Sequence, residues 1–152
     1  MPSELNEKLA RLVSEEIWNK GNLTVAEEIL TEHIVRNDAN WPEVRGLEMY
    51  KQTVVLARTA FPDWHEIIHD MVSDGDKVAC RITIAGTHKG DLLGNPPTGK
   101  HFSVSCHVMY RIEGSKIAEM WTIWDALNLY GALGVSPPSP PTGMPRAAGV
   151  RG

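Results

Sequence analysis

The sequence predicts an α+β fold, and three observations lead to that prediction. Apolar residues recur every three or four positions near the N-terminus, which is the spacing of an amphipathic helix. From residue 64 onwards, long stretches rich in β-branched and aromatic residues indicate strands. Short turn sequences such as Gly114-Ser115 separate these stretches. Helices followed by a meander of antiparallel strands form an α+β arrangement.

The individual elements follow from the same patterns. Helices are expected over residues 5–18, 25–30 and 47–60, with Ser3 and Thr24 as N-caps of the first two and Pro62 discouraging continuation of the third. A short strand is expected over 33–37, and longer strands over 64–72, 77–88, 100–112 and 116–125. Residues 127–133 are expected to form a final helical turn or two.

The chain of 152 residues has the length of a single domain, which we expect to span residues 1–134. The Pro- and Gly-rich residues 135–152 cannot form a core element, so they are expected either to be a solvated, polyproline-like tail or to pack as an arm on a neighbouring subunit.

Composition excludes several classes of function. The formal charge of −4 argues against nucleic acid as the main partner, and no stretch approaches the roughly 20 apolar residues of a membrane span. Cys80 and Cys106 fall inside predicted strands, which favours reduced core residues of a cytoplasmic protein. No spacing of His and Cys residues indicates a metal site.

Asp125 stands out because it ends a largely apolar strand. Strand alternation would place its side chain on the same face as Trp121 and Ile123. A carboxylate on an apolar face is costly unless it is hydrogen-bonded, paired or used in function. Asp is also a favoured N-cap, so Asp125 could cap the final helix, and the two roles can coexist.

A series of short motifs resembles one known family. The series includes Gly86-Thr87-His88-Lys89-Gly90, Pro96-Pro97-Thr98-Gly99-Lys100, and the closing residues Glu119, Trp121 and Asp125. It resembles the SnoaL-like polyketide cyclases, also called ester cyclases, of the nuclear transport factor 2-like superfamily, over roughly residues 5–134. The resemblance implies a cone, in which a strongly curved antiparallel sheet wraps around a pocket that the N-terminal helices close.

The same resemblance implies an activity. The family reaction is an intramolecular aldol condensation of a polyketide ester without metal or cofactor, and Asp125 matches the family's acid/base aspartate. The implied substrate is a small, apolar, carbonyl-rich metabolite. Two alternatives stay open: a non-catalytic protein that binds a small molecule on the same fold, and a hydrolase that holds a water between Asp125 and Arg81.

Other side chains are weaker candidates for substrate binding. Arg81 and His107 lie on predicted strands where the register decides between the pocket and the outer face. Asn37 could hold a carbonyl oxygen or a water, and His88 either binds ligand or fixes its own loop. Aromatic pocket walls are expected from Trp18, Tyr50 and Trp121. An apolar outer sheet face predicts a homodimer or homotetramer.

Overall fold

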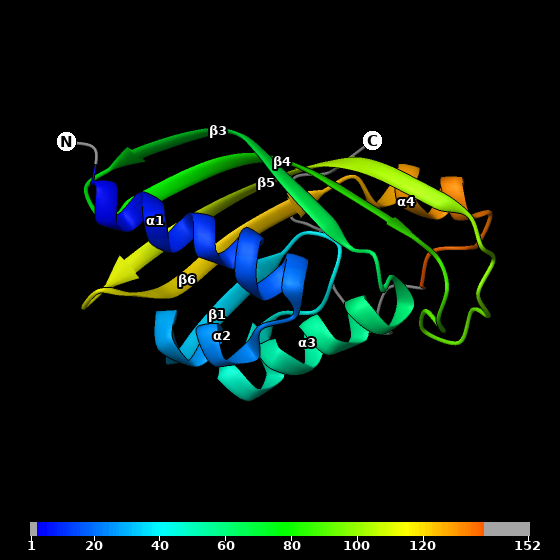
Figure 1. The fold of residues 1–152 in the computed structure, drawn as a ribbon, viewed down its shortest axis with the longest axis horizontal. Helices are drawn as coiled ribbons and strands as arrows, with labels where there is room; N and C mark the ends of the chain where they lie inside the picture. Colours follow the sequence, from blue (N-terminus) through cyan, green and yellow to red (C-terminus); the bar gives the residue numbers. More distant parts are fainter. Residues whose placement is uncertain (1–2, 139–152) are drawn as a thin grey trace, which may run out of the picture.

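A computed structural model of the chain describes residues 3–138, so most of the predicted tail lies outside the described residues. Its centre is one strongly curved sheet of six strands, and helices α1, α2 and α3 pack against one face of that sheet (Figure 1). The α+β prediction is confirmed, as is the curved sheet with helices closing a pocket.

The helices follow the predicted pattern with small shifts at their starts. They are α1 (Glu4–Leu12), a π-helical continuation η1 (Val13–Trp18), α2 (Leu23–Ile29), α3 (Leu47–Ala60) and α4 (Ala126–Leu133). The Ser3 side chain accepts the Asn6 N–H, as expected of an N-cap. The cap predicted at Thr24 is wrong. Asn22 caps α2 instead, because its side-chain oxygen accepts the Val25 N–H and the helix therefore begins earlier.

The strands are β1 (Leu30–Asp38), β2 (Val44–Arg45), β3 (His65–Asp74), β4 (Lys77–Thr87), β5 (His101–Glu113) and β6 (Lys116–Trp124). They lie in the order β2-β1-β6-β5-β4-β3. The predicted meander is the antiparallel run from β3 to β6. The first strand joins the sheet beside the last one, since β1 pairs with β6 in parallel. The β1–β6 pairing brings the ends of these two strands to the same edge of the pocket.

The register of β5 against β6 differs from a regular hairpin. Gly114 and Ser115 form the turn with φ of 56° and 67°, as two-residue turns of this kind require. An irregularity then follows at Arg111/Ile112 and places His107 opposite Ile123 rather than Thr122. Because side chains alternate between faces, this one-residue shift decides which side chains face the helices.

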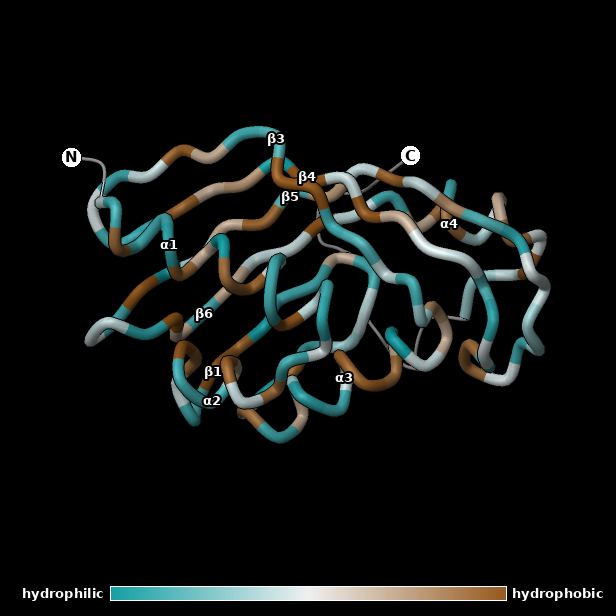
Figure 2. Tube along the Cα trace, viewed as in Figure 1, coloured by the Kyte–Doolittle hydropathy of each residue, from teal (hydrophilic) through white to brown (hydrophobic). Residues whose placement is uncertain are grey.

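The core fills the space between the helices and the inner sheet face. Apolar and polar segments alternate along β4 and β5 (Figure 2), and every second side chain of these strands is buried. The buried set on the inner face of β5 is Phe102, Val104, Cys106, Val108, Tyr110 and Ile112. Within residues 3–138 no helix is long and apolar enough to cross a membrane. No group of three or more His, Cys, Asp or Glu side chains in that range could hold a metal ion.

Candidate active site

The inner sheet face and the helices enclose a largely apolar cavity. Its space free of atoms, including the solvent at its open mouth, is about 920 Å³. Side chains from η1, α3, α4 and every strand except β2 line it. A cavity of this kind, apolar with a few polar groups, is the usual form of a small-molecule site.

Aromatic rings form much of the cavity wall. The rings of Trp18 and Trp64 lie 5.3 Å apart between centroids, and Tyr50 meets Trp18 edge-on at 6.2 Å. Further rings of the lining are Trp41, Phe61, Tyr110, Trp124 and Tyr130. Flat aromatic walls suit a ligand made of flat, conjugated rings, because offset stacking adds to the burial of apolar area.

An ion pair from β1 stands in this apolar wall. The Arg36 guanidinium contacts the Asp38 carboxylate at 2.8 Å, and the Asp38 side chain has no exposed surface. Trp124 Nε1–H donates to both Asp38 oxygens at 3.0 and 3.1 Å, and the Asn40 N–H donates to one at 2.8 Å. These contacts occupy both oxygens of Asp38 and fix Arg36 beside it.

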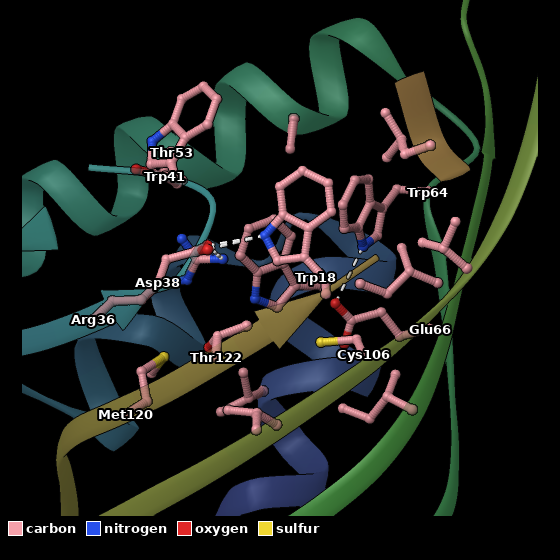
Figure 3. A pocket seen from close by; sticks show the side chains of 18 of the residues that line it. Trp18, Arg36, Asp38, Trp41, Thr53, Trp64, Glu66, Cys106, Met120 and Thr122 are labelled. Carbon is pink, nitrogen blue, oxygen red and sulfur yellow. Dashed lines mark hydrogen bonds and ion pairs between the residues drawn. The ribbon is translucent and has the colours of Figure 1, made fainter. Parts of the chain in front are cut away.

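A second carboxyl group, Glu66 of β3, lies across the cavity from this pair, next to Trp64 (Figure 3). Its oxygens accept one hydrogen bond from the Ser14 hydroxyl at 2.6 Å and one from Trp64 Nε1–H at 3.3 Å. Burial raises the pKa of the Glu66 carboxyl, although these hydrogen bonds and the charge of Arg36 act in the opposite direction. The Glu66 carboxyl therefore gains and loses its proton at a higher pH than an exposed glutamate does.

Two other ionisable groups of the cavity stay protonated at neutral pH. Trp18 Nε1–H donates to the Tyr50 hydroxyl at 2.9 Å, and burial raises the pKa of Tyr50 far above its usual value. Burial likewise raises the pKa of the Cys106 thiol to about 12. A thiol in that state is a poor nucleophile, so Cys106 serves as an apolar wall.

Of the predicted site residues, Trp18 and Tyr50 line the cavity. Arg81, His107 and Trp121 do not, because the observed register places them on the outer sheet face. There Arg81 pairs with Asp70, and His107 lies opposite Arg81 in the sheet. These three side chains have no access to the cavity from that face, which corrects the expectation that Trp121 is a pocket wall.

Asn37 and His88 also lie outside the cavity lining. The Asn37 amide donates to Glu119 and to the Met120 carbonyl, and so ties β1 to β6. The buried His88 ring accepts the Thr98 N–H at Nδ1 and holds the loop between β4 and β5, while its Nε2 has no hydrogen-bond partner among the described residues. The loop-fixing alternative for His88 agrees with this geometry.

Asp125 follows β6 and is the N-cap of α4. Its carboxylate accepts the Asn128 N–H at 3.1 Å and a second bond from the Asn128 side-chain amide. It is not part of the cavity lining, whereas Met120, Thr122 and Trp124 of β6 are. The structure thus gives Asp125 the capping role and does not bring it together with Trp18 and Tyr50.

The polar groups of the cavity were missed by sequence reasoning. Arg36 and Asp38 flank the predicted Asn37 on the same strand. The prediction therefore found the correct strand but selected a side chain on the face that points away from the cavity. Glu66 did carry a signal. It alternates with Trp64 and Ile68 along the predicted strand. A glutamate at such an apolar position is as unusual as Asp125 at the end of the last strand.

Comparisons with known proteins agree with the fold. Residues 8–133 match the family model of the SnoaL-like polyketide cyclases. The chain is 32% identical to aklanonic acid methyl ester cyclase DauD of Streptomyces sp. (strain C5) over 130 residues, which covers 82% of this chain and 80% of DauD. It is also 32% identical to aklanonic acid methyl ester cyclase DnrD of Streptomyces peucetius over 102 residues, covering 65% of this chain and 69% of DnrD.

Solved structures give the same answer for the fold. A SnoaL-like protein from Jannaschia sp. CCS1 superimposes with a TM-score of 0.82 over 90% of this chain and 99% of its own, at 21% identity, a level that bears on the fold alone. The matched family model spans most of the chain, and the DauD match covers four fifths of it. The chain therefore belongs to the SnoaL-like polyketide cyclase family.

Proposed function

We propose that this protein is a cyclase that closes a ring within a polyketide-like substrate by an intramolecular aldol addition. The observation that carries the proposal is the aromatic cavity with ionisable groups set into its wall. The names of DauD and DnrD give aklanonic acid methyl ester as the compound that those relatives cyclise, and we take this ester as the first substrate to test.

The chemistry asks for few groups. A base takes a proton from a carbon next to a carbonyl, and the resulting enolate carbon attacks a second carbonyl of the same molecule. One C–C bond forms, the π electrons of the attacked carbonyl move to its oxygen, and that oxygen takes up the proton. The reaction is an isomerisation, so no atom is gained or lost and no oxidant is consumed. The cavity supplies proximity by folding the chain, and one carboxyl group can carry the proton.

Hydrogen-bond donors for the substrate oxygens are present in the same wall. The Arg36 guanidinium and the Tyr50 hydroxyl both line the cavity as hydrogen-bond donors, and burial raises the pKa of Tyr50 so that its hydroxyl stays protonated at neutral pH. Donors held in a water-poor site stabilise a developing negative charge on oxygen more strongly than they would in water. Arg36 and Tyr50 would therefore favour the enolate.

The assignment of the acid/base role to Asp125 stays a prediction. Its carboxylate accepts hydrogen bonds from Asn128 at the start of α4, and its neighbour Trp124 lines the cavity. The cavity lining itself holds two further carboxyl groups, Asp38 and Glu66.

The proposal is tested with aklanonic acid methyl ester as substrate. Purified protein should convert it to a product of equal mass with one additional ring, as followed by chromatography and mass spectrometry. Binding seen by quenching of tryptophan fluorescence, without conversion, would replace the cyclase with a non-catalytic binding protein. A product heavier by one water would favour the hydrolase alternative. If the protein neither binds nor converts this ester, the match to this substrate class is refuted.

We also propose that the outer sheet face joins two copies of the chain. Four large apolar side chains meet there around one shallow groove: Val72, Met109, Trp121 and Ile123. Ile123 is 58% exposed and Val72 is 70% exposed, so a lone chain leaves a contiguous apolar patch in water. Sedimentation velocity of wild type should give a dimer or tetramer and that of Ile123→Glu a monomer. A monomeric wild type at micromolar concentration would refute the interface.

A further inference from the structure

We propose that Glu66 determines specificity by binding a hydroxyl group of the substrate at the β3 side of the cavity. The inference rests on the proposed cyclase function for its substrate class, and it leaves the acid/base role predicted for Asp125 unchanged. It adds one feature to that class. The substrate is a flat, conjugated compound with a free hydroxyl group at the edge that faces β3 and a carbonyl oxygen at the edge that faces Arg36 of β1.

The position of Glu66 is the first argument. It lies on the inner face of β3 opposite Ile84, and both side chains line the cavity. The strand is held at this point by Asn19, whose side chain accepts the Glu66 N–H at 2.7 Å and donates to the Glu66 carbonyl at 3.1 Å. The residue is half-buried, so its carboxyl group keeps some accessible surface within this fixed wall.

The unused hydrogen-bonding capacity of Glu66 is the second argument. The Ser14 hydroxyl donates to one of its oxygens at 2.6 Å, and Trp64 Nε1–H donates to the other at 3.3 Å. A carboxylate has about four acceptor positions, and a protonated carboxyl group also keeps acceptor positions free. In either protonation state Glu66 can therefore accept one more hydrogen bond, which a hydroxyl group of the ligand would donate.

The opposite wall of the cavity has the complementary chemistry. Arg36 lies there beside Asp38 (Figure 3), and its guanidinium carries N–H donors and no acceptor, so it selects an oxygen without a proton. Asp38 does not compete with Glu66 for a hydroxyl group, because its oxygens already accept from Arg36, Trp124 and Asn40. The cavity thus offers an acceptor on the β3 side and a donor on the β1 side.

The aromatic wall brings the edge of a flat ligand to Glu66. The rings of Trp18 and Trp64 lie 5.3 Å apart between centroids, and Trp64 is also a hydrogen-bond donor to Glu66. A ring stacked on Trp64 presents its edge, where the substituents are, to the neighbouring carboxyl group. A substituent that cannot donate leaves the buried carboxyl group short of a partner, which disfavours that ligand. Glu66 therefore selects the orientation in which the hydroxyl group faces β3.

The test compares two unreactive probes of nearly equal shape, 2-hydroxyanthraquinone and 2-methylanthraquinone. Their dissociation constants are measured by quenching of tryptophan fluorescence, at a pH where the phenol is protonated. Wild type should bind the hydroxyl probe about 10- to 100-fold more tightly than the methyl probe. Glu66→Leu should abolish or reverse this preference, and Glu66→Gln, whose amide oxygen still accepts, should keep part of it. The matched control Glu113→Leu, whose carboxyl group is exposed at the end of β5 and outside the cavity lining, should match wild type.

The preference between the probes, rather than affinity alone, decides the outcome. Equal affinities in wild type, or no binding of either probe, would overturn the inference. So would an unchanged preference in Glu66→Leu, or an equal loss of affinity for both probes, which indicates a purely structural role. If Glu66→Leu does not fold, an unchanged preference in Glu66→Gln has the same meaning. None of these measurements needs turnover, so a wild type that shows the preference but does not convert aklanonic acid methyl ester would refute the cyclase function alone.

Discussion

Replacing Asp125 separates its two possible roles, because asparagine preserves one and abolishes the other. The Asp125 carboxylate caps α4 by accepting the Asn128 N–H. Asn and Asp are nearly equal as N-caps, whereas loss of a cap to alanine costs about 1 kcal/mol, within a range of roughly 0.5–2. We therefore expect Asp125→Asn to leave the free energy of unfolding within about 0.5 kcal/mol of wild type, and Asp125→Ala to lower it by about 1 kcal/mol.

The effect on the cavity should be small in both variants. Leu129 and Tyr130 of α4 line the cavity, so fraying of this helix would loosen one wall. A loss of about 1 kcal/mol is nevertheless small beside a typical domain stability of about 5–15 kcal/mol, so nearly all molecules stay folded. Removing an acid/base group would instead cost about 10²- to 10⁴-fold in rate.

Two assays on the same samples decide between the roles. Urea unfolding followed by tryptophan fluorescence gives the free energy of unfolding, and conversion of aklanonic acid methyl ester gives kcat per folded molecule. If Asp125 carries the proton, kcat of Asp125→Asn should fall by a hundredfold or more at unchanged stability. A kcat within about threefold of wild type would leave Asp125 with the capping role alone.

Three further predictions concern the polar groups of the cavity. Because burial raises the pKa of Glu66 in the folded state, wild type loses stability as pH rises from about 4.3 towards that raised value, by about 1.4 kcal/mol per unit of elevation. Glu66→Gln should not show this loss when the free energy of unfolding is measured by urea titration at different pH values. The same dependence of that free energy on pH in both proteins would contradict the prediction. Tyr50→Phe leaves the buried Trp18 N–H without its acceptor and should cost about 1–3 kcal/mol of unfolding free energy. Arg36→Met leaves Asp38 buried without its cation and should cost about 3–5 kcal/mol, much of which Asp38→Asn in the same chain should restore.

The long helices and strands of the fold follow from local patterns, whereas the short strand β2 was not predicted. The predicted helix over residues 47–60 coincides with α3, because its apolar spacing is regular and Pro62 discourages continuation beyond Phe61. The strands from β3 to β6 lie within two residues of their predicted bounds. Each of these segments carries its own signal in a few consecutive residues, so no knowledge of distant contacts was needed.

The faces of the strands required more than local patterns. The irregularity at Arg111/Ile112 shifts β5 by one residue against β6, and so places Trp121 on the outer face, which His107 of β5 also faces. No residue type announces this irregularity, because it results from the fit of two long strands in a curved sheet. A prediction that assumed a regular hairpin therefore assigned Trp121 to the wrong side.

The cavity groups were missed for a different reason, and that reason bears on function. Arg36, Asp38 and Glu66 occupy inward positions where a stable sheet calls for apolar residues, so pattern reasoning assigned no role to them. Burying them costs free energy that the ion pair and the hydrogen bonds only partly offset. Sequences depart from the pattern of their fold mainly where function requires it. Asp125 follows local rules as a helix cap, whereas Arg36, Asp38 and Glu66 break them inside the cavity, and this contrast marks the cavity wall as the part of the sheet that function has shaped.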